Sequence, residues 1–182
     1  ARNQAPLRFA YWLPWMRPVY RALARLPNVV MTNNSAAGAR DYARWLDVPE
    51  DRIQVIYNAL APEALVPAAP PDVAALRARF GIAADAPVVG SIFRFYDEKN
   101  PLVWIATAAA VAARKPEARF LLVGEGPMRA SMQEAARGAG IADRVIFAGE
   151  MPDPKPALAA LQVFLLASRE EGLPNVVIEA LV

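Results

Sequence analysis

The sequence predicts an α/β fold in which a parallel sheet is covered by helices on both faces. From Pro87 onward, short apolar runs that predict strands alternate with segments of helical periodicity. Strands that are apolar on both faces are typical of parallel sheets between two layers of helices. The 182 residues are 55% hydrophobic and 21% charged. That composition is globular, and the length suffices for one domain or for one domain and part of another.

The chain begins with a smaller strand-helix-strand unit. Residues 29–33 (VVMTN) predict a buried strand, and a second strand follows at 53–56. Between them Ser35 is placed to cap a helix at about 36–46, where apolar residues recur at helical spacing.

A proline-rich passage at 61–71 is the strongest linker signal in the sequence. We therefore expect a domain boundary there. A short helix at about 71–80, ended by Gly81, should follow.

The second part of the chain alternates regularly. We expect strands at 87–92, 119–123, 144–148 and 163–166, and helices at about 101–114, from Pro127, at about 154–161 and from about Pro174. Proline fits the first position of a helix because that position needs no backbone donor. At Val182 the last helix has run only about two turns, so we expect this sheet domain to be incomplete.

Composition excludes several kinds of chemistry. Cysteine and histidine are both absent. This excludes disulfides, thiolate nucleophiles and zinc held by cysteine, and removes the commonest general base and metal ligand. Any catalysis must use carboxylates, cationic side chains and backbone dipoles. The net charge of +2 is too small to indicate a nucleic-acid-binding protein.

Ligands of open parallel sheets bind beyond the carboxyl ends of the strands, where we expect the loops 93–100, 124–127 and 167–174. The first loop (FRFYDEKN) holds Arg94 and Lys99, which can clamp the two phosphates of a nucleotide diphosphate. The alternative is that its own acids neutralise both cations as loop salt bridges, and the loop alone favours this alternative.

The second loop (VGEGP) resembles the start of a dinucleotide-binding fingerprint. Arg129 stands where the third glycine of GxGxxG belongs, so the full motif is absent. A tight strand-to-helix turn is the favoured role of these glycines. Backbone amides that point at a ligand are the alternative.

The third loop (SREEGLPNVVIEALV) carries the strongest signal. Glu171 and Glu179 stand eight positions apart, on either side of the expected start of the last helix. Helical side chains lean toward the N-terminus, where unpaired backbone donors lie, so both carboxylates could reach one bound molecule and accept sugar hydroxyls. The alternative, that they only complement the helix dipole, is about equally favoured by spacing alone.

In order along the chain, five segments resemble the large retaining glycosyltransferase family 4, which has the two-domain GT-B fold. They are VVMTNNSAAGARDYARWL with IQVIYNA, GSIFRFYDEKNP, FLLVGEGPMRASM, RVIFAGEM and the EX7E motif SREEGLPNVVIEA. The resemblance implies a GT-B type, Rossmann-like doubly wound sheet, incomplete at both ends. It assigns 1–60 to the end of the N-terminal (acceptor) domain, 61–86 to a linker with a first helix, and 87–182 to the donor-binding domain.

The resemblance also implies residue roles. Arg94 and Lys99 would bind the donor diphosphate and stabilise the departing nucleotide, and Glu171 would contact the donor sugar. Glu179 would hold the ribose hydroxyls. The turn Gly172, Leu173, Pro174 and Asn175 would support sugar and phosphate, and the base would lie near Gly149, Glu150 and Met151.

The activity implied is transfer of a hexose from a UDP- or GDP-sugar, with retention at the anomeric carbon, to a glycan or lipid-linked acceptor. No metal and no other cofactor is expected, because the two cations and the helix end would replace a divalent ion. A non-catalytic nucleotide-sugar-binding module and a GT-B phosphorylase or synthase are the alternatives. A basic protein that binds nucleic acid or membrane is a more distant one. The piece alone is expected to bind donor without turnover.

Two hypotheses fit the composition of the opening segment 9–26. Residues 1–27 carry five arginines, several aromatic residues and no acid. The segment could lie on an anionic membrane surface, or it could pack its aromatic side chains into the rest of the protein, and the second reading is favoured. We expect a cytoplasmic protein, with peripheral membrane contact in the first case. At the expected domain junction, Tyr57-Asn58-Ala59-Leu60 departs from the family's pattern because Ala replaces a glycine.

Overall fold

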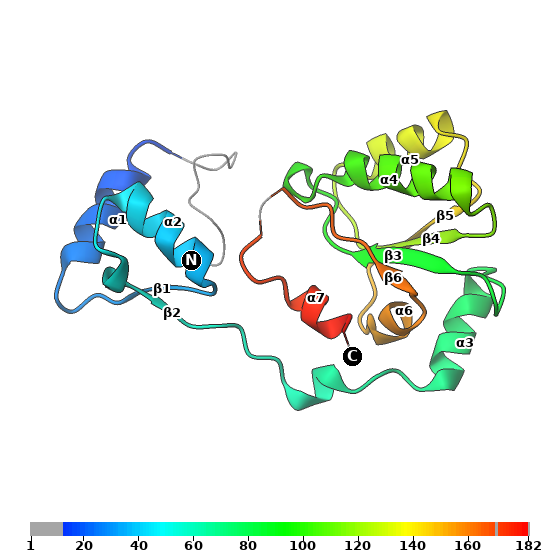
Figure 1. Cartoon of the computed structure of the whole chain (residues 1–182), viewed down its shortest axis with the longest axis horizontal. Coiled ribbons are helices and arrows are strands. Elements are labelled where there is room, and N and C mark those ends of the chain that lie inside the picture. Colours follow the sequence, from blue (N-terminus) through cyan, green and yellow to red (C-terminus); the bar gives the residue numbers. More distant parts are fainter. Residues whose placement is uncertain (1–12, 170, 182) are drawn as a thin grey trace. The chain divides into compact units, whose positions relative to one another are not determined.

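The computed structural model describes residues 13–169 and 171–181, which divide into two compact units. The first unit is formed by the chain up to Leu60 together with residues 170–175, and the second by Ala61–Arg169 and Val176–Val182 (Figure 1). The division at Leu60 falls where the proline-rich passage begins.

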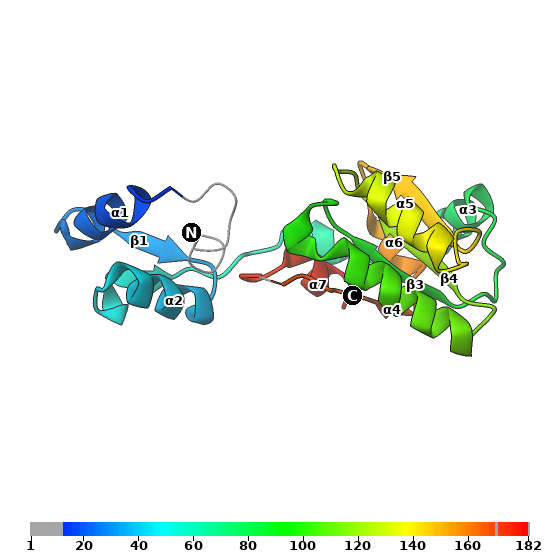
Figure 2. The same ribbon diagram turned by 90° about the horizontal axis from the view of Figure 1, so that it is seen from above.

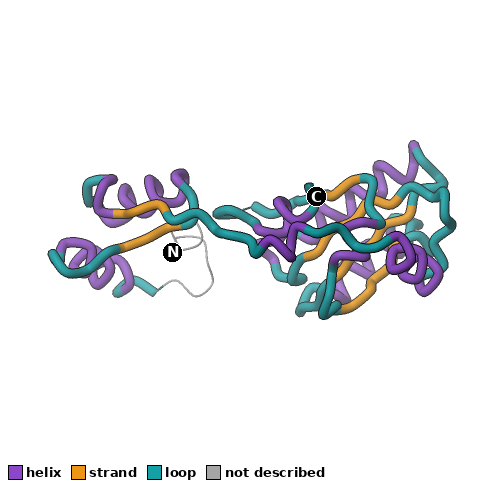
Figure 3. Tube along the Cα trace, turned by 90° about the horizontal axis from the view of Figure 1, so that it is seen from below, coloured by secondary structure: helices purple, strands orange, loops and turns teal. Residues whose placement is uncertain are grey.

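The first unit is built from two helices and a two-stranded parallel sheet (Figure 3). Its elements are α1 (Met16–Arg25), β1 (Met31–Asn33), α2 (Ala36–Leu46), the 3-10 turn η2 (Glu50–Arg52) and β2 (Ile53–Val55). In the sheet Met31 lies opposite Ile53 and Asn33 opposite Val55. Ser35 caps α2 as expected, because its hydroxyl accepts a 3.0 Å hydrogen bond from the backbone N–H of Gly38.

Aromatic packing holds this unit together. Trp45 of α2 is 7% exposed and makes edge-to-face contacts with Tyr20 of α1 and with Tyr42. The side chain of Arg52 closes the end of α1, where its guanidinium donates to the backbone carbonyls of Ala24 (2.8 Å) and Leu26 (2.9 Å).

The second unit contains a four-stranded parallel sheet with the strand order β5-β4-β3-β6 (Figure 1). Figure 2 shows β5, β4 and β3 from another side. The strands are β3 (Val88–Ile92), β4 (Arg119–Val123), β5 (Val145–Gly149) and β6 (Val163–Phe164). The helices are α3 (Pro70–Arg79), α4 (Pro101–Arg114), α5 (Arg129–Gly138), α6 (Lys155–Ala159) and α7 (Asn175–Glu179), with the 3-10 turns η3 (Pro62–Leu65) and η4 (Asp97–Lys99).

Alternation along β4 shows that helices cover both faces of this sheet. Phe120 and Leu122 belong to a core that they form with α4 and α5, whereas Leu121 and Val123 belong to a second core with α3 and α6. Figure 1 shows α4 and α5 over one face and α6 over the other. The expected doubly wound α/β arrangement is therefore confirmed.

The helix starts differ slightly from the expectation. Pro127 lies two residues before α5 and Pro174 one residue before α7. After Gly126 the chain makes a turn in which the N–H of Met128 donates to the carbonyl of Phe95 (3.0 Å), so α5 begins later. Strand β6 ends at Phe164, although the N–H of Leu165 still reaches Gly90 (2.9 Å).

Candidate functional site

The carboxyl ends of β3, β4 and β5 meet at one edge of the sheet in the second unit. The N–H of Phe93 donates to Val123 (3.1 Å), and the N–H of Gly124 donates to Gly149 (2.8 Å). The loops that follow these three strands therefore lie next to one another. This is the edge at which ligands of open parallel sheets bind.

The loop after β3 is anchored by Phe95, which is fully buried. The N–H of Phe95 donates to the backbone carbonyl of Glu125 (2.8 Å). Its ring contacts the rings of Phe93 and Phe147 edge to face. With Phe95 inside, the neighbouring Arg94 is left outside, and 73% of its side chain is exposed. A buried aromatic residue thus fixes the backbone beneath a solvent-facing cation.

The ion pairs of this loop only partly match the expected internal neutralisation. Arg94 lies 3.9 Å from Glu98, and its guanidinium lies 5.3 Å from the ring centroid of Tyr96. Asp97 instead binds Arg169 at 3.0 Å. An exposed pair at 3.9 Å contributes little, so Arg94 remains available to an anionic ligand. Lys99 is half-buried on the same loop.

Arg169 was not among the residues singled out from the sequence. Besides its ion pair with Asp97, its backbone N–H donates to the carbonyl of Glu98 (3.1 Å). It therefore fastens the start of the third loop to the loop that carries Arg94. Its place in the run SREEG, beside the first glutamate of the motif, was the only available signal.

The two glycines after β4 are required by close backbone packing. A Cβ at Gly124 would lie 2.1 Å from the carbonyl oxygen of Phe93, and one at Gly126 would lie 2.6 Å from that of Phe95. Both have positive φ angles, +132° and +155°. These contacts explain the glycines without a ligand, in agreement with the favoured structural role.

The residues expected to contact the nucleobase follow β5. Glu150 is exposed, whereas Met151 is half-buried and packs on the core that β4 forms with α3 and α6. Gly149 precedes them with a φ of +77°. Only Glu150 thus offers a fully solvent-facing side chain here.

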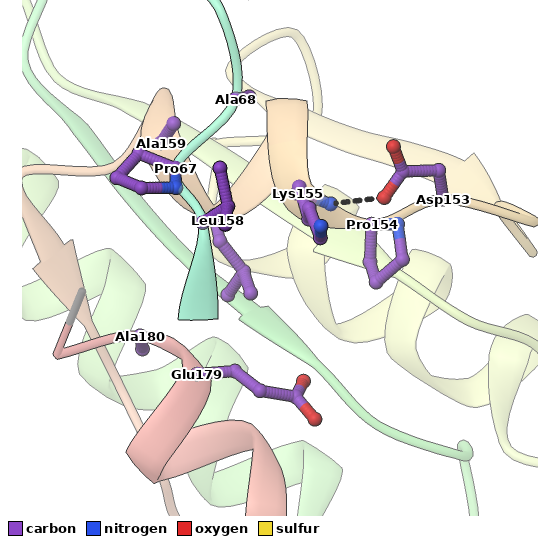
Figure 4. A pocket seen from close by; sticks show the side chains of 10 residues that line it. Pro67, Ala68, Asp153, Pro154, Lys155, Leu158, Ala159, Glu179 and Ala180 are labelled. Atoms are coloured by element: carbon purple, nitrogen blue, oxygen red, sulfur yellow. Dashed lines mark hydrogen bonds between the residues drawn. The ribbon is translucent and has the colours of Figure 1, made fainter. Parts of the chain in front are cut away.

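Glu179 lies at the end of α7 and lines a cavity of about 190 Å³ within the second unit (Figure 4). Lys155, Leu158 and Ala159 of α6 line the same cavity, as do Val66, Pro67, Ala68, Asp153, Pro154 and Ala180. Pockets that enclose whole ligands measure roughly 300–1,000 Å³. This cavity is therefore smaller than a pocket that encloses a whole ligand.

The turn before α7 belongs to the first unit and is held by Asn58. The side-chain amide of Asn58 donates to the carbonyl of Leu173 (2.9 Å) and to Oδ1 of Asn175 (2.6 Å). Glu171, Gly172 and Pro174 of this turn are all half-buried. Glu171 thus lies in the first unit and Glu179 in the second, and their convergence on one ligand stays a prediction.

A polar cavity of about 390 Å³, which we call the asparagine pocket, lies in the first unit beyond the carboxyl ends of β1 and β2. It is lined by Thr32, Asn33, Asn34, Ile56, Tyr57, Asn58, Ala59 and Asn175. Sequence inspection named only Asn175 of these as a site residue. The signal was present, because Asn34 follows a strand as directly as the loops that were singled out.

Two arginines in the described part of the segment 9–26 bind groups within the first unit. Arg17 donates to the carbonyl of Trp45 (2.6 Å), and Arg21 pairs with Asp47. Trp15 and Val19 of the same segment are exposed. Residues 9–12 of this segment lie outside the described residues, and membrane contact stays a prediction. Within residues 13–169 and 171–181, no helix has the length and apolar character needed to cross a membrane.

Sequence comparison matches residues 86–182, more than half of the chain, to the family of group 1 glycosyl transferases. The protein VipC/TviE of Vi polysaccharide biosynthesis in Salmonella typhi is 39% identical over 168 residues, 92% of this chain and 29% of that protein. The 2-deoxystreptamine glucosyltransferase of Streptomyces kanamyceticus is 37% identical over 132 residues, covering 71% of this chain and 34% of that enzyme. The chain thus spans about a third of the length of these curated relatives.

Solved structures show the same fold. HepE of Anabaena, crystallised with UDP and glucose, superposes with a TM-score of 0.81 at 23% identity, over 93% of this chain and 46% of HepE. WaaG, a glycosyltransferase involved in lipopolysaccharide biosynthesis, gives 0.71 at 16% identity, over 86% of this chain and 42% of WaaG. The expected GT-B type fold is thereby confirmed. With the family model matching more than half of its residues, the chain belongs to the group 1 glycosyltransferases.

Proposed function

We propose that the protein is a retaining glycosyltransferase of family 4 that transfers a hexose from a UDP- or GDP-sugar to a glycan or lipid-linked acceptor. The family match supports glycosyl transfer. Relatives named for polysaccharide and lipopolysaccharide biosynthesis support a glycan or lipid-linked acceptor. HepE structures with UDP and UDP-glucose support a nucleotide-sugar donor.

One observation carries the proposal: Arg94 stands exposed on a rigid loop at the sheet edge where β3, β4 and β5 end. Lys99 is on the same loop. A guanidinium and an ammonium at this edge suit a diphosphate, because the planar fork of Arg and the mobile charge of Lys can engage several phosphate oxygens.

In the proposed reaction the bond between the anomeric carbon and the diphosphate oxygen breaks, and negative charge grows on the departing nucleotide. Arg94 and Lys99 stabilise that charge more strongly than the charge of the intact donor, which lowers the barrier. Glu171 accepts hydrogen bonds from the donor sugar, and Glu179 holds the ribose. The cations fill the role of a divalent metal, so we propose that none is needed.

The base and sugar contacts in this proposal involve Glu150, Met151 and the turn Gly172, Leu173, Pro174 and Asn175. The Glu179 cavity supports the ribose assignment in one respect. It lies beside Asp153 and Lys155, which closely follow the expected base-binding residues in the chain.

Isothermal calorimetry of the full-length protein with UDP and GDP tests the proposal. We expect Arg94→Ala and Glu179→Ala each to weaken binding of the preferred nucleotide by about tenfold or more, the loss of one charged hydrogen-bonding partner. The Arg94 effect should shrink at high salt, because the side chain is exposed.

Arg114→Ala and Glu117→Ala are matched controls. Both side chains are exposed and lie just before β4, at the opposite edge of the sheet. They should leave the affinity unchanged. Unchanged affinity in the Arg94 and Glu179 variants would refute the roles assigned to these residues. Binding without turnover against a panel of UDP- and GDP-sugars would instead identify a non-catalytic module.

A further inference from the structure

The loop after β3 carries as many acids as cations. Arg94 and Lys99 are balanced by Asp97 and Glu98, so the loop 93–100 has no net charge of its own. A nucleotide diphosphate is an anion, and a neutral loop has no net attraction for it. The loop therefore needs a further cation, or the withdrawal of one acid, before it can favour such a ligand.

The chain after β6 supplies that cation. The guanidinium of Arg169 donates from Nη1 to Oδ2 of Asp97, at 3.0 Å. The backbone N–H of Arg169 also donates to the carbonyl of Glu98 (3.1 Å). Because this second bond already fixes the backbone of Arg169 beside the turn η4, less conformational entropy is lost when its side chain pairs with Asp97.

The fold of the turn keeps Asp97 near Arg94. The N–H of Tyr96 donates to the carbonyl of Arg94 (2.8 Å), and the N–H of Asn100 donates to the carbonyl of Asp97 (2.8 Å). Charges on such a compact turn lie within the screening length of salt solution, roughly 8–10 Å at physiological ionic strength. An Asp97 carboxylate without its partner would therefore compete with a bound anion for Arg94 and would repel that anion.

Glu98 is the weaker competitor of the two acids. It lies 3.9 Å from Arg94, at the limit of an ion pair, and most of the Arg94 side chain is exposed. A pair of this kind contributes little. The pairing of Asp97 thus decides how available Arg94 is, and Asp97 is paired outside its own loop.

We propose that Arg169 is a positioning residue for diphosphate binding: it holds the carboxylate of Asp97 away from Arg94 and gives this edge of the loop a net positive charge. The inference rests on the proposed glycosyl transfer, in which Arg94 binds the donor diphosphate. Arg169 acts through Asp97, 72 positions earlier in the chain, and needs no contact with the ligand itself.

Calorimetry of the full-length protein with UDP and GDP at low salt tests the inference. Arg169→Ala should weaken binding of the preferred nucleotide about two- to fivefold, the effect expected of an exposed charge pair. Asp97→Asn should bind at least as tightly as the wild type, because it removes the acid that Arg169 holds.

The double variant of Arg169→Ala and Asp97→Asn separates the electrostatic role from a merely structural one. It should recover the affinity lost in Arg169→Ala, because two cations and one acid leave the same net charge as three cations and two acids. If Arg169 only fastened the two loops together, Asp97→Asn would weaken binding as Arg169→Ala does, and the double variant would stay weak. Either result, or unchanged affinity in Arg169→Ala, would overturn the proposal.

Arg137→Ala is the matched control. Arg137 pairs with Glu134, and the exposed fractions of these side chains, 60% and 74%, are close to the 58% and 73% of Arg169 and Asp97. It lies in the last turn of α5, which leads back to the start of β5 at the opposite edge of the sheet. Its loss should leave the nucleotide affinity unchanged.

Inorganic pyrophosphate distinguishes a failure of this inference from a failure of the proposed function, because it offers two phosphates without base, ribose or sugar. A wild-type protein that binds pyrophosphate but neither UDP nor GDP counts against the proposed function, and the same variants are then compared with pyrophosphate. Normal binding of UDP or GDP that does not depend on Arg169 counts against the inference alone. Absence of binding by all three probes counts against both.

Discussion

Replacing Gly124 by alanine should destabilise the second unit and disturb the loop that carries Arg94. The new Cβ would lie 2.1 Å from the carbonyl oxygen of Phe93 and 3.0 Å from its carbonyl carbon. Because both are backbone atoms, no side-chain rotation relieves the contact. The loop after β3 must move, and the bond from the N–H of Phe95 to Glu125 (2.8 Å) is strained or lost.

The expected loss follows from two contributions. A non-glycine residue at a φ of +132° costs about 1–3 kcal/mol. Forcing a methyl group into a filled space costs about 1–3 kcal/mol more. The free energy of unfolding should therefore fall by about 2–6 kcal/mol, and the melting temperature by at least about 8 °C for a unit of this size.

Urea-induced unfolding followed by circular dichroism measures this loss. Gly138→Ala is the control, because Gly138 is the last residue of α5 and a Cβ there has nothing within 4 Å. It should leave stability unchanged or raise it by up to about 1 kcal/mol. A loss below about 1 kcal/mol for Gly124→Ala, with the control behaving as expected, would refute the close-packing argument.

Two further substitutions test the packing of the second unit. Trp104→Phe should lower the free energy of unfolding by about 1–3 kcal/mol, because the fully buried indole loses its 2.8 Å bond to Ser91 and leaves a small void; an unchanged urea midpoint would contradict this. Arg77→Ala should cost about 1–3 kcal/mol, because its guanidinium binds the carbonyls of Ala83 (2.8 Å) and Ala160 (3.0 Å) and joins α3 to the end of α6. Arg79→Ala is an exposed change on the same helix that removes only a cation–π contact with Phe80 (5.1 Å to the ring centroid), and it should cost less than about 1 kcal/mol in the same urea titration.

The candidate site was predictable where a rule of local position applied. Arg94 and Lys99 could be predicted because they follow a strand with a clear apolar run. Backbone hydrogen bonds between the ends of β3, β4 and β5 place their loop at the ligand-binding edge of the sheet. The same rule applied to β1 would have singled out Asn34. An asparagine at such a position also fits turn geometry alone, so the sequence does not distinguish the two roles.

Pairing among charged residues was not predictable in the same way. One alternative for the first loop was that Asp97 and Glu98 neutralise its cations, but Asp97 forms an ion pair with Arg169 from the third loop. The two lie 72 positions apart in sequence, so no local spacing predicts the pair. The hydrogen bond between Asn58 and Asn175 likewise joins residues 117 positions apart. From the sequence, Asn58 was noted only as part of a junction that departs from the family's pattern.

By itself, the sequence determined the elements and much of their extent. The helix from Ala36 to Leu46, the helix from Pro101 to Arg114 and the strand from Arg119 to Val123 fall where caps and apolar periodicity place them, because those signals act between residues a few positions apart. Only the tertiary structure decided the strand order β5-β4-β3-β6, the need for glycine beside Phe93, and the ion pair between Asp97 and Arg169. Each of these depends on atoms that distant parts of the chain bring within a few ångströms, and folding fixes those distances where spacing along the chain does not.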